Sequence, residues 1–508
     1  MSKFLKYLLV VLLLLVTLRT SGDLDLGWHL RYGEYFFQTG EILKDNVISY
    51  VWPDYKWVEA SWGYDLILYQ IFTHFGFFGI SVSGYVISLL TFILIINPIK
   101  RSGFFQLFFL GTLFISQTIP LYSSSMRAQS LSAFFFVYLS MFFYRYFRDE
   151  QLPKYLSPLF LPLFFLFWSN LHGSFILGLL LLLIYWLCWG LILVHIHIKN
   201  PSIAKFQPKR WVLLGISILI SLITPLINPW GFRLYLESFK HSSNVNLTGI
   251  SEWMPIGFFT LAGILGIITI LLVLFLALRK RQIADIPYII IFLILSYLSF
   301  SAVRFLIYFG IMATFYVAKN INVLSINKLF HANISSKLNI MFKVILVTLV
   351  LLEAIFINEY FRFPNKDIIN FNWNDYCKII YAENIQAKDC SEDITAEMIK
   401  NPPQGNGYHP YNYGGYLSWR VPEIKTFIDG RMVSWEENGQ TPPLAEQDWV
   451  ISEKSPIAFR KLDSRYHFQW IIIPTFTPVT KYLNELAKSG AWEKRFYDVF
   501  YSYFVKRN

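Results

Sequence analysis

Long apolar segments occupy most of the first 360 residues of the chain, and short polar segments separate them. A helix needs about 17 or more apolar residues to cross roughly 30 Å of hydrocarbon. By this criterion the pattern predicts membrane helices near 4–18, 79–98, 103–120, 128–144, 155–170, 174–196, 211–227, 257–278, 284–301, 303–319 and 340–359. We therefore predict a polytopic α-helical membrane protein with about eleven transmembrane helices.

The first apolar segment, from Phe4 to about Leu18, follows a short basic stretch, as the core of a signal peptide does. A signal peptide would be followed by a small-residue cleavage pattern. Here Asp23 and Asp25 follow almost at once instead. We therefore expect an uncleaved first helix.

Lysines and arginines collect in short segments between the apolar ones, as the positive-inside rule expects of cytoplasmic loops. Eleven helices with a cytoplasmic N-terminus place all six basic segments in the cytoplasm. Residues 60–76 could form a twelfth span, but Arg145 and Arg148 would then face outward, and the polar side chains of 60–76 suit a helix lying along the membrane surface. The basic segments contain Lys3 and Lys6; Lys100 and Arg101; Arg145, Arg148 and Lys154; Lys199, Lys205, Lys209 and Arg210; Arg279, Lys280 and Arg281; and Lys319, Lys328 and Lys337.

An odd number of helices places the C-terminal region, 360–508, on the extracytoplasmic side. In this more polar region, β-rich runs at 426–429 and 470–474 alternate with helix-like runs at 455–466 and 479–490. The pattern predicts a compact extracytoplasmic α/β domain. The transmembrane domain would be residues 1–359, with a first outer loop and juxtamembrane helices at 21–78. The protein would reside in the inner or plasma membrane of the cell.

The three cysteines divide between these two regions. Cys377 and Cys390 fall in the outer domain and could form a disulfide there. Cys188 lies in a predicted span, and we interpret it as a side chain that packs between helices.

The composition agrees with a membrane protein and excludes several other classes. Of the 508 residues, 55% are hydrophobic and only 15% are charged, whereas an average soluble protein has about 25% charged residues. A disordered chain, a disulfide-rich scaffold and an ordinary cytosolic enzyme are therefore excluded. The net charge of +11 would suit a nucleic-acid partner, but the cations lie in the loops that set the topology. We expect no nucleic-acid partner.

Two aspartates follow the first helix directly, in Asp23-Leu-Asp25-Leu-Gly-Trp28-His29. Carboxylates two residues apart can share a divalent cation such as Mg²⁺ or Mn²⁺. Alternatively, one carboxylate whose pKa is raised by its neighbour and by partial burial can act as a general base. A structural interpretation is that they cap the helix that follows, since Asp favours helix starts. Their position at the membrane surface, beside Trp28 and His29, favours a functional role.

Single ionisable side chains lie at the predicted outer ends of several apolar helices. Such groups are costly at the edge of hydrocarbon and often mark a functional site. Guanidinium groups bind phosphate through two parallel hydrogen bonds, so cations opposite an acidic loop suit a phosphate-bearing lipid. For each residue alone, snorkelling of an arginine or a helix-end hydrogen bond of a histidine explains the position equally well. The candidates are Arg127, His172, Arg233 and Arg304.

The outer domain contains two further motifs, NYGGYLSWR at 412–420 and FIDGR at 427–431. The glycine pair at 414–415 predicts a tight turn before a strand. Asp429 and Arg431 either form a structural pair in a turn or contact a substrate. The sequence has no GxGxxG motif, P-loop or nucleophile elbow, which argues against direct use of a nucleotide sugar or ATP.

This arrangement resembles the GT-C superfamily of membrane glycosyltransferases, and in outline its aminoarabinose-transferase and protein-mannosyltransferase-like branch. In that branch an acidic pair precedes a helix ending in Gly, and a second juxtamembrane helix ends in Phe-Gly. Here Asp25 precedes Gly40 by fifteen residues, and the segment that begins at Glu59 ends in Phe75-Gly76, although the Pro-Pro of the second helix is missing. The motifs DLDLGWHLRYGEYFFQTG, NLHG, NPWG and NYGGYLSWR are similar to those of a broad group of bacterial membrane proteins described as glycosyltransferases.

The resemblance implies a different role for each group of candidate residues. A polyprenyl-phosphate-linked sugar would lie with its lipid between helices and its phosphate at the outer surface. Asp25, with Asp23 as substitute or metal ligand, would deprotonate an acceptor hydroxyl, which attacks the anomeric carbon with inversion. Cations would stabilise the leaving phosphate. The residues implied in binding are Trp28, His29, Glu59, Arg127, His172, Arg233, Arg304, Asp429 and Arg431. The sugar, the acceptor and the need for a metal stay open.

Two other classes of protein share parts of this pattern. A transporter or flippase of lipid-linked substrates would also be polytopic, but the sequence has no paired half-repeats and no acidic residue deep within a predicted span except Glu353, which lies near an outer end. A non-catalytic scaffold with the same fold is the second alternative. An outward cavity holding the aspartates and arginines and open to lipid would favour the enzyme, and a polar path to both faces would favour the transporter.

Overall fold

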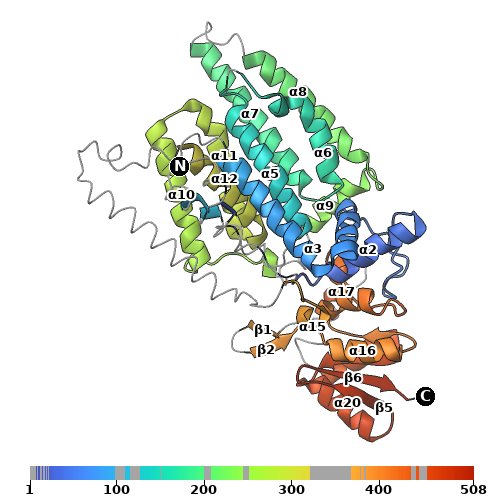
Figure 1. Cartoon of the computed structure of the whole chain (residues 1–508). Coiled ribbons are helices and arrows are strands. Elements are labelled where there is room, and N and C mark those ends of the chain that lie inside the picture. The colour runs from blue at the N-terminus through green and yellow to red at the C-terminus, as the bar shows by residue number, and fades with distance from the viewer. Residues whose placement is uncertain are drawn as a thin grey trace, which may run out of the picture. The chain divides into compact units, whose positions relative to one another are not determined.

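We describe the chain from a computed structural model (Figure 1). It describes residues 22–97, 109–111, 113–114, 126–149, 151–199, 207–243, 251–320, 368–377, 379–382, 385–435, 442–445 and 455–507, with single positions between 7 and 20. Most of the predicted helices 4–18 and 103–120, and all of 340–359 with Glu353, lie outside these residues. The chain divides into unit 1 (Met1–Thr20, Ile80–Ser238, Thr248–Asn365) and unit 2 (Ser21–Gly79, Phe239–Leu247, Lys366–Asn508).

Unit 1 is built from apolar helices. Figure 1 shows α5, α6, α7 and α8 running alongside one another, and α12 packs against α5 and α11. Short 3-10 turns precede or follow several of these helices, at Pro158–Phe160, Thr224–Leu226, Ile283–Asp285 and Val303–Phe305. The helices are α5 (Ala128–Arg145), α6 (Leu161–Ser169), α7 (Phe175–Lys199), α8 (Gln207–Ile223), α10 (Leu261–Lys280), α11 (Ile286–Ser301) and α12 (Leu306–Asn320), with α9 (Arg233–Ser243) continuing into unit 2.

Five helices in the described residues are long and apolar enough to cross a membrane. They are Trp62–Ile96, Phe175–His195, Pro208–Leu226, Ala262–Lys280 and Ile283–Ser301. The protein is therefore an integral membrane protein. The predicted span 155–170 is a shorter apolar helix, Pro158–Ser169, because prolines at 158 and 162 restart the helix there. The count of eleven helices stays a prediction.

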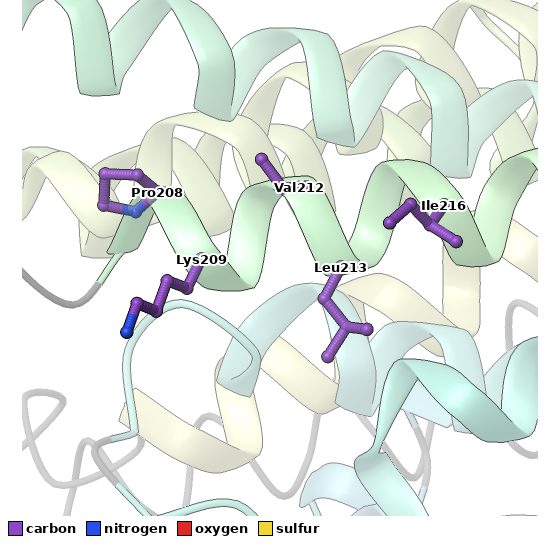
Figure 2. A pocket seen from close by; sticks show the side chains of 5 residues that line it. All are labelled: Pro208, Lys209, Val212, Leu213 and Ile216. Atoms are coloured by element: carbon purple, nitrogen blue, oxygen red, sulfur yellow. The ribbon is translucent and has the colours of Figure 1, made fainter.

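Helix α8 presents an apolar surface to its surroundings. Leu219 and Ile223 are 63% and 62% exposed, which is expected of side chains that face lipid. A shallow hollow of about 410 Å³ lies along this helix. Figure 2 shows the side chains that line it, which are those of Pro208, Lys209, Val212, Leu213 and Ile216. The hollow lies on the apolar surface of α8, and none of the candidate site residues lines it.

Helix α3 (Trp62–Ile96) covers both the predicted surface helix 60–76 and the predicted span 79–98. Its backbone leaves the helical conformation at Gly76, with φ 59° and ψ −154°, a region that essentially only glycine adopts. The two predicted segments are therefore two helical pieces joined by a kink. The first piece belongs to unit 2 and most of the second to unit 1.

Unit 2 combines the first outer loop with the C-terminal region. A four-stranded sheet has the order β3-β4-β6-β5, in which β3 and β4 are parallel and the other pairs are antiparallel. Helix α2 (Leu26–Thr39) packs against α17 (Tyr411–Arg420), and α20 packs against β5. The strands are β3 (Gly407–Tyr408), β4 (Trp470–Pro474), β5 (Trp492–Tyr497) and β6 (Tyr501–Lys506), with a hairpin of β1 (Ile379–Ala382) and β2 (Ile385–Lys388).

The remaining helices of unit 2 are α15 (Trp373–Tyr376), α16 (Glu392–Lys400), α19 (Pro456–Tyr466), α20 (Pro478–Lys488) and the 3-10 helix η11 (Gly430–Ser434). The helix-like runs at 455–466 and 479–490 and the strand at 470–474 are confirmed. A disulfide joins Cys377 to Cys390. Unit 2 includes residues 21–79, most of which the division expected from the sequence assigned to the transmembrane domain, and that division stays a prediction.

The turn predicted at the glycine pair 414–415 is wrong, because both glycines lie inside α17. A Cβ on Gly415 would lie 2.6 Å from the carbonyl oxygen of Leu24, and one on Gly414 would lie 1.9 Å from the carbonyl oxygen of Ile428. Contacts this short exclude any side chain at either position. The glycines therefore let α17 approach the backbone of the first outer loop and of the FIDGR segment.

The strand predicted at 426–429 is also wrong. Thr426 makes one isolated parallel bridge with Ser49, and the neighbouring backbone groups bond to side chains. The backbone N–H of Phe427 donates to Nε2 of His409 at 2.7 Å, and the Phe427 carbonyl accepts from Oγ of Ser49 at 2.9 Å. These side chains replace a strand partner and hold the FIDGR segment against the first outer loop.

Candidate active site

Asp25 occupies the N-cap position of α2 but does not accept a cap hydrogen bond through its side chain. Its Oδ1 instead accepts a hydrogen bond from Nε1 of Trp28 at 2.9 Å. Asp23 is buried, and its Oδ1 accepts from the backbone N–H of Asp25 at 3.3 Å. Asp23 therefore supports the helix start, and the half-buried carboxylate of Asp25 is oriented by an indole.

Gly430 lies directly against the carboxylate of Asp25. A Cβ at this position would be 1.8 Å from Oδ1 of Asp25 and 3.1 Å from Nε1 of Trp28. The space that Asp25 occupies thus exists only because residue 430 has no side chain. This contact joins the DLDLGWH motif to the FIDGR motif, which is more than 400 residues away in the sequence.

His29 lies beside Trp28 and pairs with a carboxylate from α3. The ring centroids of Trp28 and His29 are 3.6 Å apart, and Nδ1 of His29 is 2.5 Å from Oδ1 of Asp65. Asp65 is fully buried, and its Oδ2 has no hydrogen-bond partner in the described part of the chain. Sequence analysis did not place Asp65 in the site. The available signal was a carboxylate next to an apolar helix, which is costly unless it has a partner.

Glu59 is a third buried carboxyl group in this part of unit 2. Its Oε1 accepts from the backbone N–H of Ser61 at 2.6 Å. Burial raises the pKa of Glu59 to about 7, and the charge of Asp25 adds to the rise, whereas the Ser61 hydrogen bonds and the charge of Arg431 lower it. Glu59 can therefore hold or release a proton near neutral pH. We call Asp23, Asp25, Glu59 and Asp65 the carboxylate cluster.

Arg431 and Asp429 form a fully buried ion pair. Nε of Arg431 is 2.8 Å from Oδ1 of Asp429, and Nη2 is 2.6 Å from Oδ2. The guanidinium also lies 5.2 Å from the ring centroid of Trp57 and 5.8 Å from that of Trp435. The pair therefore has the structural role that one interpretation expected, and it also brings a cation within electrostatic range of Glu59.

In unit 1, two of the predicted cations converge on one carboxylate. Arg127 forms an ion pair with Glu252 through Nη1, and Arg304 lies 4.1 Å from the ring centroid of Trp253. Burial raises the pKa of Glu252, but the charges of Arg127 and Arg304 outweigh burial and leave it below its ordinary value. We call Arg127, Arg304 and Glu252 the arginine cluster.

His172 belongs to a hydroxyl network in unit 1. Its Nδ1 lies 2.8 Å from Oγ of Ser132 and 2.8 Å from Oγ of Ser174. Nε1 of Trp168 also donates to Oγ of Ser132, at 3.1 Å. These contacts favour the structural role for His172. Arg233 is exposed at the first residue of α9.

A metal site formed by Asp23 and Asp25 would need further ligands. In the described ranges no group of three or more His, Cys, Asp or Glu side chains lies close enough to hold a metal ion. The use of a divalent cation stays a prediction, and we derive no step through a metal.

The fold is similar to that of two membrane-protein structures, an oligosaccharyltransferase and ArnT, which is the kind of fold that the resemblance implied. No protein-family model matches the chain, and no curated protein matches its sequence. The likeness is therefore one of structure alone, at sequence identities too low to transfer the role of any residue.

Solved structures of two proteins illustrate this similarity in fold. One is the oligosaccharyltransferase AglB from Archaeoglobus fulgidus in complex with an inhibitory peptide and a dolichol-phosphate, at a TM-score of 0.60 and 12% identity over 93% of this chain and 69% of AglB. The other is ArnT from Cupriavidus metallidurans bound to undecaprenyl phosphate, at 0.52 and 13% over 99% of this chain and 97% of ArnT. An AglB structure in complex with Zn and sulfate matches at 0.54 and 11%, over 92% of this chain and 68% of AglB.

Proposed function

We propose that this protein is a membrane glycosyltransferase that moves a sugar from a polyprenyl-phosphate-linked donor to an acceptor at the outer face of the membrane. The observation that carries the proposal is the carboxylate of Asp25, oriented by Trp28 in a space left by Gly430. A general base must be held in position before it can assist proton transfer efficiently. The dolichol-phosphate in AglB and the undecaprenyl phosphate in ArnT support a lipid-phosphate donor.

In the proposed reaction, Asp25 accepts the proton of an acceptor hydroxyl. The resulting oxygen nucleophile attacks the anomeric carbon, and the bond between that carbon and the phosphate oxygen breaks. Both electrons of this bond leave with the lipid phosphate, and the single displacement inverts the anomeric centre. The acceptor is a hydroxyl-bearing glycan, lipid or protein.

The other carboxyl groups of the cluster support this step. Asp23 holds the backbone at the head of α2, and Asp65 orients the His29 ring through Nδ1. Glu59, with its pKa near 7, accepts or donates a hydrogen bond to a sugar or acceptor hydroxyl. Aromatic faces such as those of Trp28 and Trp57 suit the apolar face of a pyranose ring.

The arginine cluster provides the phosphate-binding group in this proposal. Two guanidinium groups and one carboxylate leave one positive charge in excess, and preorganised cations stabilise a leaving phosphate. His172 would support the surrounding helix ends, and Arg233 would contribute at most from its exposed position. We further propose that the N-terminus is cytoplasmic and that 360–508 is extracytoplasmic. A reporter fused after Asn508 and active only in the cytoplasm would contradict this orientation.

The first experiment measures sugar transfer from a polyprenyl-phosphate sugar in vesicles that contain the purified protein. Asp25→Asn keeps the shape of the side chain and removes its charge, so the rate should fall by about 10²–10⁴. Asp23→Asn should lose less. The matched control is Asp45→Asn, because Asp45 lies in the same loop with an exposed carboxylate paired to Lys56. Full activity of Asp25→Asn would contradict the assignment of Asp25 as the general base and make Glu59 the next candidate for this role.

The same vesicles test the transporter hypothesis. Passage of the intact lipid-linked sugar across the vesicle membrane, without transfer of the sugar, would favour the transporter.

A further inference from the structure

A second group of cations lies in unit 1, away from the arginine cluster, where the ends of four helices meet. Lys280 is the last residue of α10, Lys319 lies in the last turn of α12, and Arg148 follows α5. Asp285 ends the 3-10 turn before α11. The three cations come from three of the basic segments that the sequence places on the same side of the membrane, and their contacts bring them together with Asp285.

The cations surround a single aromatic ring. The guanidinium carbon of Arg148 lies 3.7 Å from the ring centroid of Tyr144, and Nζ of Lys280 and Lys319 lie 5.5 and 5.7 Å from it. Lys280 also donates a hydrogen bond to the Tyr144 hydroxyl at 3.1 Å. We call Arg148, Lys280 and Lys319 the basic cluster.

One buried carboxylate offsets part of this charge. Asp285 forms an ion pair with Arg148, lies 4.0 Å from Nζ of Lys280, and accepts from the Tyr316 hydroxyl at 2.9 Å. Three positive charges therefore face one negative charge. The C-terminal ends of α5, α10 and α12 contribute about half a negative charge each, and the start of α11 contributes about half a positive charge. The cluster still has an excess of positive charge.

The hydrogen bonding of Arg148 independently indicates a missing acceptor. Its Nε and Nη1 are buried, and neither has a hydrogen-bond partner among the residues the structure describes. Buried guanidinium donors without an acceptor are costly. Next to them, the amines of Lys280 and Lys319 are half-buried rather than sealed off, so an anion can reach the cluster.

We propose that the basic cluster binds the phosphate of an anionic lipid headgroup. Lys280 ends the span Ala262–Lys280, and Asp285 lies at the start of the span Ile283–Ser301. The cluster is thus at the depth of lipid headgroups, which favours a lipid over a free phosphate. Basic pockets between the ends of membrane helices are a recognised setting for anionic headgroups. This site is separate from the arginine cluster and does not depend on the proposed transfer reaction.

The test compares lipid retained by the purified full-length protein, measured by native mass spectrometry after exchange from phosphatidylcholine vesicles with and without phosphatidylglycerol. Wild type should retain phosphatidylglycerol preferentially. The double variant Lys280→Gln/Lys319→Gln should weaken retention about 30-fold, since each surface cation contributes about fivefold. Arg148 is left intact because its loss would strand the buried carboxylate of Asp285.

Lys209→Gln is the matched control, because Lys209 is an exposed cation at the start of α8. It should leave retention unchanged. Equal retention of both lipids by wild type would overturn the proposal, as would unchanged retention in the double variant or an equal loss in the control. Inorganic phosphate added during exchange should compete weakly. Complete displacement of phosphatidylglycerol by phosphate would show an anion site that does not select a lipid. Far-UV circular dichroism and elution volume check that the double variant is folded.

Discussion

The carboxylate cluster of unit 2 and the arginine cluster of unit 1 are both polar groups within largely apolar surroundings, but they carry opposite charge. In the first, four carboxyl groups are accompanied by Arg431, which Asp429 already neutralises. In the second, two guanidinium groups share Glu252. A displacement that releases phosphate needs both kinds of group, a base for the nucleophile and cations for the leaving group. The comparison teaches that the two clusters differ in charge in the way that the two tasks of the proposed reaction require.

The two clusters also differ in how they are held. Asp25 and Glu59 are fixed by an indole, a glycine contact and a backbone N–H, so their positions depend on close packing. The arginines depend mainly on charge, through Glu252 and the face of Trp253. Small steric changes should therefore damage the carboxylate cluster, and salt or charge changes should damage the arginine cluster.

After Asp25→Asn itself, the largest effect is expected from Gly430→Ala, which tests the steric half of this comparison. The new Cβ would lie 1.8 Å from Oδ1 of Asp25 and must displace the carboxylate. Misplacing a catalytic group by about 1 Å can cost roughly a hundredfold in rate. We expect a loss of this size in transfer with unchanged binding of polyprenyl phosphate.

Gly40→Ala is the control for Gly430→Ala. Gly40 ends α2 at a positive φ of 74°, and a Cβ there meets nothing within 4 Å. It adds backbone strain of about 1–2 kcal/mol without touching Asp25. If both variants lose the same activity, the glycine contact has no special role in placing the base.

The next effect concerns Glu59 and the stability of unit 2. Its pKa is about 7 in the folded chain against 4.5 for an ordinary glutamate, so the folded state binds a proton more tightly. Its contribution to stability is complete below pH 4.5 and is lost as the pH rises through 7. The free energy of opening should fall by roughly 3 kcal/mol across this window.

Hydrogen exchange of unit 2 amides from pH 4.5 to 8 measures this loss, after correction for intrinsic exchange rates. Glu59→Gln should remove the contribution of Glu59 and leave a remainder from Asp65 and Asp389, whose pKa values burial also raises. Glu41→Gln, at an exposed position of the same loop, should keep the full pH dependence. If the opening free energy of wild type does not change with pH, the pKa of Glu59 is not raised in the folded chain.

The smallest effect is expected from Ser132→Ala, which tests whether His172 belongs to the arginine cluster. The substitution removes the acceptor of Trp168 Nε1 and one contact of His172, at a cost of about 1–3 kcal/mol in stability. Thermal unfolding in detergent measures this cost. Retention of polyprenyl phosphate should hardly change. A loss as large as that of Arg304→Ala would make His172 part of the phosphate-binding group.

The sequence predicted those elements whose signals are local. The strand at Trp470–Pro474 and the helices α19 and α20 follow from short runs of β-branched residues and from proline and hydroxyl residues at helix starts. The kink at Gly76 separates residues 60–76, which were predicted to lie along the membrane surface because of their polar side chains, from the predicted span 79–98. The sequence left open whether Cys377 and Cys390 form a disulfide, because the spacing of two cysteines does not show whether their side chains meet.

Other features depend on contacts between distant segments and could not be predicted. Gly415 lies within a helix because it contacts Leu24, and Gly430 is required by Asp25. Asp65 belongs to the carboxylate cluster only because α3 brings it to His29. A single sequence shows a glycine or an aspartate but not the backbone or side chain that approaches it.

The most direct test of the proposed roles of the two clusters compares retention of polyprenyl phosphate by wild type, Arg127→Ala, Arg304→Ala and Asp25→Asn. A charged hydrogen bond contributes about 1.5–3 kcal/mol, so each arginine variant should bind the lipid about tenfold more weakly or worse. Arg279→Ala, at an exposed position of α10, serves as the control. Asp25→Asn should retain the lipid as wild type does. Equal losses in Asp25→Asn and in both arginine variants would contradict the division of base and phosphate binding between the two clusters.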